Sequence, residues 1–188
     1  MIKIKSSPLL WLFPLVLFFI SADKAKLMKV KVNENITVSV PKDWTPMSDD
    51  DIAQRYPSVR APLMAYTNAE RVSDFSVNVS ATQWPDDDLE LAKKFFKAGL
   101  VNMFDRVDMI DEGIHEVRGK KLIFFEFESR ISGNRQQEGL KDPVLRYTYI
   151  QYFLEPGRAV VFSFNCPRHD REQWQETARA MMQEIRIK

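Results

Sequence analysis

The sequence predicts an α+β fold in which helices cover both faces of an antiparallel β-sheet, an α/β/α sandwich. Three observations lead to this prediction. Alternation of apolar and polar residues, the period of a half-buried strand, dominates the first half of the chain. Later strands are joined by short turns, so they run antiparallel, yet they are apolar on both faces. Two segments with apolar residues at helical spacing are available to cover those faces.

Short strands are predicted in the first half of the chain. Residues 35–40, NITVSV, alternate strictly, and residues 27–32 do so less cleanly, so that Asn33-Glu34 could close the two into a hairpin. Residues 74–81, DFSVNVSA, form a third strand, and residues 63–67 are a weaker candidate. The side chains expected to point inward are Ile36, Val38, Val40, Phe75, Val77 and Val79.

Longer strands follow residue 109. The first of them turns at Gly119, and Glu155-Pro156-Gly157-Arg158 reads as a type II turn, with Pro second and Gly third. Tyr147, Tyr149 and Tyr152 could line a pocket, but tyrosines at strand spacing are expected in the core. The predicted strands are residues 114–118, 122–127, 144–154 and 159–166.

Two amphipathic helices are predicted. One runs from Asp87 to Phe104 and the other from Asp170 to the end of the chain. Phe95 and Phe104 are expected to widen the apolar stripe of the first helix. The stripes are Leu89, Ala92, Phe96, Leu100 and Met103 in the first helix, and Trp174, Ala178, Met181 and Ile185 in the second.

Two triplets of acids raise the question of a cation site. Ser48 lies three residues before Asp51, the spacing of a capping box, and acids in a first helical turn oppose the macrodipole favourably. Asp86 to Asp88 precede the longer helix, where Asp87 to Glu90 repeats that spacing. A calcium loop would place carboxylates at alternate positions and include a glycine. The triplets therefore indicate helix starts, and no metal site is predicted.

The N-terminus has the order of a secretory signal peptide. Lys3 and Lys5 precede an apolar run from Pro8 to Ile20, and small residues follow. We expect cleavage after Ala22, which leaves residues 23–188 as a single domain. An uncleaved leader that anchors an accessory subunit to a membrane is the alternative. Apart from this segment, no membrane contact is predicted.

Composition excludes one large class of partners. Met1 to Ala22 hold two of the 27 basic residues and none of the 26 acidic ones, so the mature chain is almost neutral. Nucleic-acid binders usually carry a basic stripe, because neutralising phosphates supplies most of their affinity. We therefore predict no nucleic-acid partner, and we expect an exported protein, bacterial and periplasmic or extracellular.

Cys166 and His169 are the one candidate catalytic pair, a nucleophile with its base. The spacing by itself is weak, and the strand alternation places the Cys166 side chain on an apolar face, where a thiol is inert and its pKa is raised. His115 has neighbours that suggest a solvent-exposed strand. Phosphate-binding glycine loops and a Gly-x-Ser-x-Gly elbow are absent from the sequence. No catalytic residue and no cofactor is predicted.

Two further features concern the surface. Asn35 and Asn78 begin Asn-x-Ser/Thr sequons on expected polar strand faces, which matter only in a eukaryotic secretory pathway. Residues 131–142 are polar and contain glycine, so they are expected to form a mobile loop.

The order of elements resembles the PsbP-like superfamily. The resemblance rests on VSVPKDW (Val38–Trp44), on the Gly119 turn in EVRGKKLIFFEFE, and on AVVFSF (Ala159–Phe164) before the terminal helix. It implies an antiparallel sheet between helices, used for binding or assembly without catalysis. The group includes intracellular import factors and type VI chaperones as well as the envelope protein DcrB, and the leader favours an envelope role like that of DcrB.

Two hypotheses from different classes follow. The first is a non-enzymatic exported binding or assembly module of the cell envelope, whose partner is another protein or a small apolar ligand and which displays an aromatic patch or groove. The second is a hydrolase that uses Cys166 and His169, whose side chains must then lie within hydrogen-bond reach in an open cleft. No binding residue is assigned from the sequence.

Overall fold

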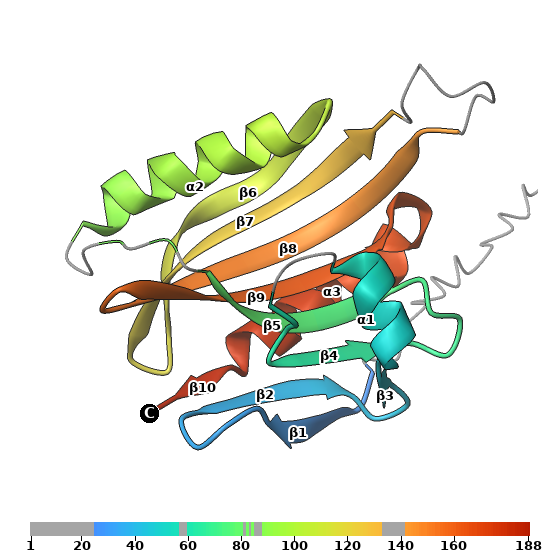
Figure 1. The fold of residues 1–188 in the computed structure, drawn as a ribbon, viewed down its shortest axis with the longest axis horizontal. Helices are drawn as coiled ribbons and strands as arrows, with labels where there is room; N and C mark the ends of the chain where they lie inside the picture. The colour runs from blue at the N-terminus through green and yellow to red at the C-terminus, as the bar shows by residue number, and fades with distance from the viewer. Residues whose placement is uncertain (1–24, 57–59, 81, 83, 85–87, 133–141) are drawn as a thin grey trace, which may run out of the picture.

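The computed structural model describes residues 25–56, 60–80, 82, 84, 88–132 and 142–188. Its main sheet has seven strands, ordered β3-β4-β5-β9-β8-β7-β6 and antiparallel throughout, and β1, β2 and β10 form a smaller sheet (Figure 1). The strands are β1 (Leu27–Lys31), β2 (Ile36–Pro41), β3 (Thr45–Pro46), β4 (Met64–Thr67), β5 (Asp74–Ser80), β6 (Arg106–Val117), β7 (Lys120–Ile131), β8 (Val144–Glu155), β9 (Arg158–Pro167) and β10 (Arg186–Ile187). The helices are α1 (Asp49–Arg55), α2 (Leu89–Met103), α3 (Arg171–Gln183) and the short 3-10 helix η1 (Arg168–Asp170).

The turns that sequence analysis singled out have the expected geometry. Asn33 closes the β1–β2 hairpin, because its side chain accepts hydrogen bonds from the backbone N–H groups of Asn35 and Ile36, both at 2.8 Å. Arg118 and Gly119 join β6 to β7 with φ of 51° and 82°, a combination whose twist suits a two-residue hairpin. Gly157 has φ of 76°, as a type II turn requires.

Strand β6 is longer than predicted. It begins at Arg106, well before Ile114, and a bulge between Met109 and Asp111 shifts its register against β7. A bulge adds a residue to one strand, so the side-chain alternation reverses at that point. The period-two pattern is therefore broken in the part of β6 that sequence analysis left unassigned.

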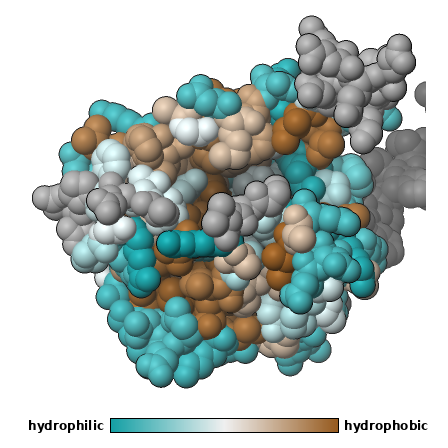
Figure 2. Space-filling view, viewed as in Figure 1, coloured by the Kyte–Doolittle hydropathy of each residue, from teal (hydrophilic) through white to brown (hydrophobic). Residues whose placement is uncertain are grey.

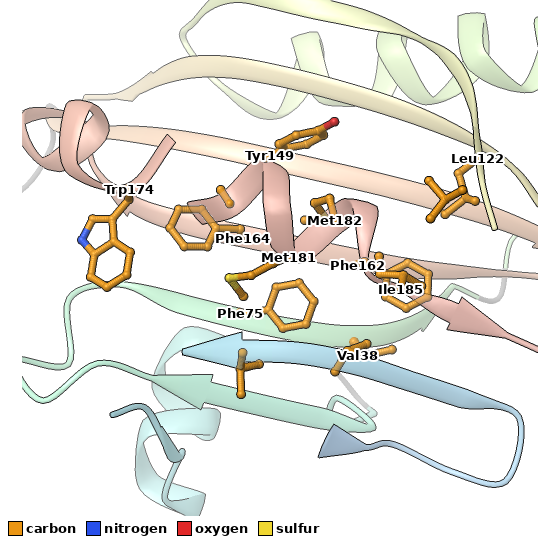
Figure 3. Close-up of a cluster of buried hydrophobic side chains, with 14 of the residues drawn as sticks. Val38, Phe75, Leu122, Tyr149, Phe162, Phe164, Trp174, Met181, Met182 and Ile185 are labelled. Carbon is orange, nitrogen blue, oxygen red and sulfur yellow. The ribbon is translucent and has the colours of Figure 1, made fainter. Parts of the chain in front are cut away.

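Helix α3 and the inner face of β2 cover one face of the main sheet. Met181 and Met182 of α3, and Ile185 just after its end, are at most 1% exposed and lie among side chains of β5 and β9 (Figure 3). The Trp44 ring lies 5.2 Å from that of Trp174, edge on. Trp174, Ala178 and Met181 of the predicted stripe are buried on α3. The helix ends at Gln183 and not at the end of the chain as predicted, because the chain continues into β10, a two-residue strand paired with β2.

Helix α2 lies over β6 and β7 on the opposite face (Figure 1). Ala92, Phe96 and Leu100 are buried, and the Phe96 ring stacks on Tyr152 of β8 with centroids 4.2 Å apart. The prediction for the edges of this stripe is wrong: Phe95 is 50% exposed and Met103 is 67% exposed. Helices thus cover both faces of the sheet, as predicted, but the buried stripe of α2 is narrower than the predicted one.

The described acids of the two triplets lie at helix starts. Ser48 caps α1, where its hydroxyl accepts a hydrogen bond from the backbone N–H of Asp51. Asp88 caps α2, since its carboxylate accepts from the Leu91 N–H at 2.9 Å. The predicted capping residue, Asp87, lies outside the described residues, and the observed cap is one position later. No group of three or more His, Cys, Asp or Glu side chains suited to a metal ion occurs in the described ranges.

The predictions for His115, for the two sequons and for the N-terminal leader have different outcomes. His115 is half-buried instead of solvent-exposed, with its ring stacked on Phe124. Asn35 lies in the turn before β2 and is exposed, whereas Asn78 is half-buried in β5 and donates to Ser76 Oγ. The leader and most of the predicted loop at 131–142 lie outside the described residues. Among the helices that are described, none is long and apolar enough to cross a membrane.

Candidate functional site

The outward side of α2 is unusually apolar for a helix exposed to water. Opposite its buried stripe, this surface is formed by Leu91, Lys94, Phe95, Ala98 and Val101, and we call it the α2 face. Leu91 is 51% exposed and Val101 is 47% exposed, close to the value for Phe95. Figure 2 shows hydrophobic surface along this helix, at the top of the view. Three large apolar side chains about half-exposed on one helix are typical of an interaction surface, so the α2 face is a candidate docking site.

An aromatic series connects the α2 face to the core. The Trp84 ring lies 5.2 Å from the Phe95 ring and 6.5 Å from the Phe96 ring, and Phe96 stacks on Tyr152. The Trp84 indole N–H donates to the Asp88 carbonyl at 3.3 Å, which ties the residue to the start of α2. Large aromatic side chains held from behind lose little conformational freedom on binding, which is why they are enriched at the centres of interfaces.

Lysines border the α2 face. Lys97 Nζ lies 2.7 Å from a carboxylate oxygen of Glu112 in β6, and Lys93 lies 3.8 Å from the other oxygen. Lys94 forms no ion pair within the described part of the chain and is exposed. Glu112 therefore offsets charge on Lys93 and Lys97, and Lys94 is the lysine of α2 that has no acidic partner among the described residues.

Buried carboxylates elsewhere serve the fold. Asp74 of β5 is 2% exposed and accepts hydrogen bonds from Arg55 at 2.7 Å, Tyr56 at 2.6 Å and Asn165 at 3.1 Å. Burial, and then the Asp74 carboxylate, raise the pKa of Tyr56, so the phenol stays a donor. These bonds satisfy the carboxylate and hold α1 against the sheet, a structural role.

Glu126 of β7 has the corresponding role under α3. It is 1% exposed, accepts from Tyr147 Oη at 2.9 Å and from Arg179 Nε at 3.1 Å, and is also bonded to Gln175. Burial is the main cause that raises the pKa of Tyr147, and the Glu126 carboxylate adds to it. Every partner is a hydrogen-bond donor, so the carboxylate is fully engaged in holding α3 to the sheet.

The predicted catalytic pair is not assembled. Cys166 is fully buried, and burial raises the pKa of its thiol to about 12. The side chain of His169 is 83% exposed and its Nε2 lies 3.5 Å from Asp170. No hydrogen bond joins Cys166 to His169 in the described structure. The expectation that the Cys166 side chain lies on an apolar face is confirmed.

Known proteins with a similar structure are distant in sequence. The chain superposes on cyanobacterial PsbP (CyanoP) from Synechocystis sp. PCC 6803 with a TM-score of 0.58 and 11% identity, over 87% of this chain and 94% of that one. The fold is PsbP-like. The Ran-binding protein Mog1p of Saccharomyces cerevisiae gives 0.56 and 14% over 87% and 96%, and LpqN of Mycobacterium tuberculosis, described as involved in cell envelope biogenesis, gives 0.55 and 15% over 86% and 90%. No protein-family model and no curated protein matches the sequence.

Sequence reasoning missed the α2 face, although a signal was present. Phe95 and Met103 were counted as members of the buried stripe. That assignment, together with Leu91 and Val101, would place apolar residues around most of the helix. A sheet can cover only one side of a helix, so the surplus was itself an indication of an exposed apolar surface.

Proposed function

We propose that this PsbP-like domain is a non-enzymatic binding or assembly module of the cell envelope that docks another protein on the α2 face. The observation that carries the proposal is the exposure of Leu91, Phe95 and Val101 on a helix whose opposite side is fully packed. Water-exposed apolar side chains gathered on one surface are typical of interaction sites. Lys94, which has no acidic partner among the described residues, suits a partner with an acidic residue beside its apolar contact.

A protein partner fits this surface better than a small apolar ligand does. Small-molecule sites are concave and mostly apolar, whereas the α2 face is the outer side of a helix. The hollows found in the described structure are lined largely by charged side chains, among them Arg168, Glu128 and Asp108. Tyr147, Tyr149 and Tyr152, which could have lined a pocket for such a ligand, are all buried in the core. A small apolar ligand is therefore only the second candidate.

Two observations support an envelope location. The N-terminal segment has the order of a secretory signal, and LpqN, which shares the fold, is described as involved in envelope biogenesis. Mog1p, which also shares the fold, is described as Ran-binding, so the fold alone does not decide the compartment. Mass spectrometry of the exported protein tests this part: a mature N-terminus at Asp23 supports export with cleavage, and an intact Met1 supports the anchored alternative.

Site-specific photo-crosslinking tests the docking surface. A photoreactive phenylalanine analogue replaces Phe95 in the full chain in its native cells, and the same analogue replaces Gln173, an exposed residue of α3, as the matched control. We expect one defined protein adduct from position 95, none from position 173, and loss of the adduct when Leu91→Ser is added. Equal adducts from both positions, or an adduct that Leu91→Ser leaves unchanged, would contradict the proposal.

The hydrolase alternative has a separate test. A nucleophilic thiol must ionise near neutral pH, and burial opposes this at Cys166. We expect a thiol reagent at neutral pH to leave the native protein unmodified and to react at once after unfolding in denaturant. Rapid modification of the native protein, slowed by His169→Ala, would instead favour a Cys/His-dependent hydrolase.

A further inference from the structure

A charged pocket lies at the far end of the main sheet from the hairpin turns of Gly119 and Gly157. It has a volume of about 280 Å³ and is formed where β6, β7 and β8 approach η1. A second hollow of about 620 Å³ continues from it along the start of α3 and shares Glu128, Leu145 and Arg168 with it. The lining of the first pocket includes Arg106, Asp108, Glu128, Arg130, Leu145 and Arg168.

Two arginines face each other in this pocket. The register of β6 against β7 sets Arg106 directly opposite Arg130, and like charges in directly opposed positions destabilise a sheet. Arg106 is relieved by Asp108, whose carboxylate lies 2.9 Å from its Nε. Arg130 is exposed, and its side chain forms neither a hydrogen bond nor an ion pair within the described part of the chain.

The two carboxylates of the pocket are already neutralised. Asp108 is opposite Glu128 in the same register, two residues along from the arginine pair, and each carboxylate is paired with arginine. Glu128 lies 2.6 Å from Arg168 Nε and 2.9 Å from Arg171 Nη1. The three arginines that line the pocket therefore outnumber its two acids, and the uncompensated charge is that of Arg130.

Unused donors and an apolar wall complete the site. Arg168 engages Glu128 through Nε, so the N–H groups at the end of its guanidinium remain available, as do all those of Arg130. Leu145, which pairs with Arg130 across β7 and β8, is 38% exposed, and Pro143 lies beside it in the lining. Guanidinium groups bind carboxylate and phosphate oxygens in pairs, with geometry that a lysine does not offer.

We propose that this pocket binds a small ligand through an oxyanion group, a carboxylate or a phosphate, held between Arg130 and Arg168 with its apolar part against Leu145. The site is independent of the α2 face, because its arginines project from the side of the sheet that α3 covers. Folding does not require two arginines in opposed positions, whereas binding of an anion explains them. The oxyanion takes the place of an ion-pair partner, which Arg130 does not have among the residues that the structure describes.

Isothermal titration of the mature domain with two probes, inorganic phosphate and octanoate, tests the site. Binding of phosphate alone identifies a phosphate group as the ligand's anion, and binding of octanoate identifies a carboxylate with an apolar chain. We expect Arg130→Gln to weaken binding of the probe by about tenfold or more, since one charge-assisted contact is lost. Leu145→Ser should weaken octanoate and leave phosphate unchanged.

Arg158→Gln is the matched control, because Arg158 is an exposed arginine in the β8–β9 turn at the opposite end of the sheet. It should bind both probes as the unaltered protein does. The proposal is overturned if neither probe binds in the millimolar range, or if Arg130→Gln and Arg158→Gln weaken binding equally, which would indicate only a general effect of net charge. Circular dichroism of each variant confirms that the fold is retained.

Discussion

Helices α2 and α3 cover opposite faces of one sheet, yet their outer surfaces differ. Towards the sheet both present large apolar side chains, Phe96 in α2 and Met181 in α3. Towards water, α3 is polar, with Glu172, Gln173, Glu176 and Gln183 all exposed, whereas α2 exposes Leu91, Phe95 and Val101. The packing of the fold requires the inner faces only. The outer face of α2 therefore carries information about function that the outer face of α3 does not.

The inner surfaces of the helices also differ in chemistry. Under α3, the buried Glu126 joins the sheet to Arg179 by charge-assisted hydrogen bonds. Under α2, the contacts are aromatic and aliphatic, and the ion pairs of Lys93 and Lys97 lie at the edge of the sheet on Glu112. Four changes test how far this comparison holds.

Phe96→Ala should have the largest effect on stability. Phe96 is 7% exposed and stacks on Tyr152, so truncation leaves a cavity under α2 and should cost about 3–5 kcal/mol of the free energy of unfolding. Urea denaturation followed by far-UV circular dichroism measures it. A loss below about 1 kcal/mol would mean that α2 is not packed as described.

Glu126→Gln should weaken the attachment of α3. The amide keeps the shape of the side chain but gives up the charge that Arg179 and Tyr147 share, and we expect a loss of about 1.5–3 kcal/mol in the free energy of unfolding. Glu176→Gln is the control: this carboxylate also lies near Arg179 but is 70% exposed, so its removal should change stability by less than about 0.5 kcal/mol. Equal losses in the two variants would contradict the assignment.

A smaller effect should depend on pH through His115. Burial lowers the pKa of His115 in the folded state, with the Asp111 carboxylate opposing the shift, and Gln151 lies 2.7 Å from its Nε2. As the pH falls through about 6.5, the unfolded chain takes up this proton before the folded protein does, so stability declines from neutral to mildly acidic pH. His115→Gln should flatten that part of the pH profile of the free energy of unfolding. An unchanged slope would assign the dependence to other groups.

The smallest effect on stability is expected at Phe95. Phe95→Ala removes a half-exposed ring beside Trp84 and should cost no more than about 1 kcal/mol. The Phe95→Ala protein should nevertheless fail to compete for the partner that the probe at position 95 captures, whereas the unaltered protein should compete. The two adjacent phenylalanines would then have different roles: Phe96 stabilises the fold and Phe95 binds the partner. A large loss of stability at Phe95 would instead make the α2 face part of the core.

Much of the fold was predictable because local chemistry specifies it. The alternation around Val38 and Phe75, the Pro156-Gly157 turn and the Ser48 cap are each determined by a few neighbouring residues. The bulge in β6 and the pairing of β10 with β2 were not predictable, because a two-residue strand and a register shift leave no periodic signal. The PsbP-like resemblance, which rests on element order, is confirmed at the level of the fold.

The candidate sites were less predictable than the fold. Sequence spacing put Cys166 near His169 along the chain, but the strand points the sulfur into the core and η1 points the imidazole to solvent. The pocket at Arg130 joins residues from three strands and a helix, and no short stretch of sequence carries that arrangement.

The sequence by itself determined most of the strands and helices, the place of several turns and caps, and the need to cover both faces of the long strands, because periodicity and turn chemistry act over a few residues. Only the tertiary structure decided which apolar residues are buried where the helices pack on the sheet. It left Phe95 exposed while burying Phe96, and it set Arg130 opposite Arg106 with no acid paired to Arg130 among the described residues. Burial and cross-strand register depend on how distant segments meet, and no local pattern encodes that.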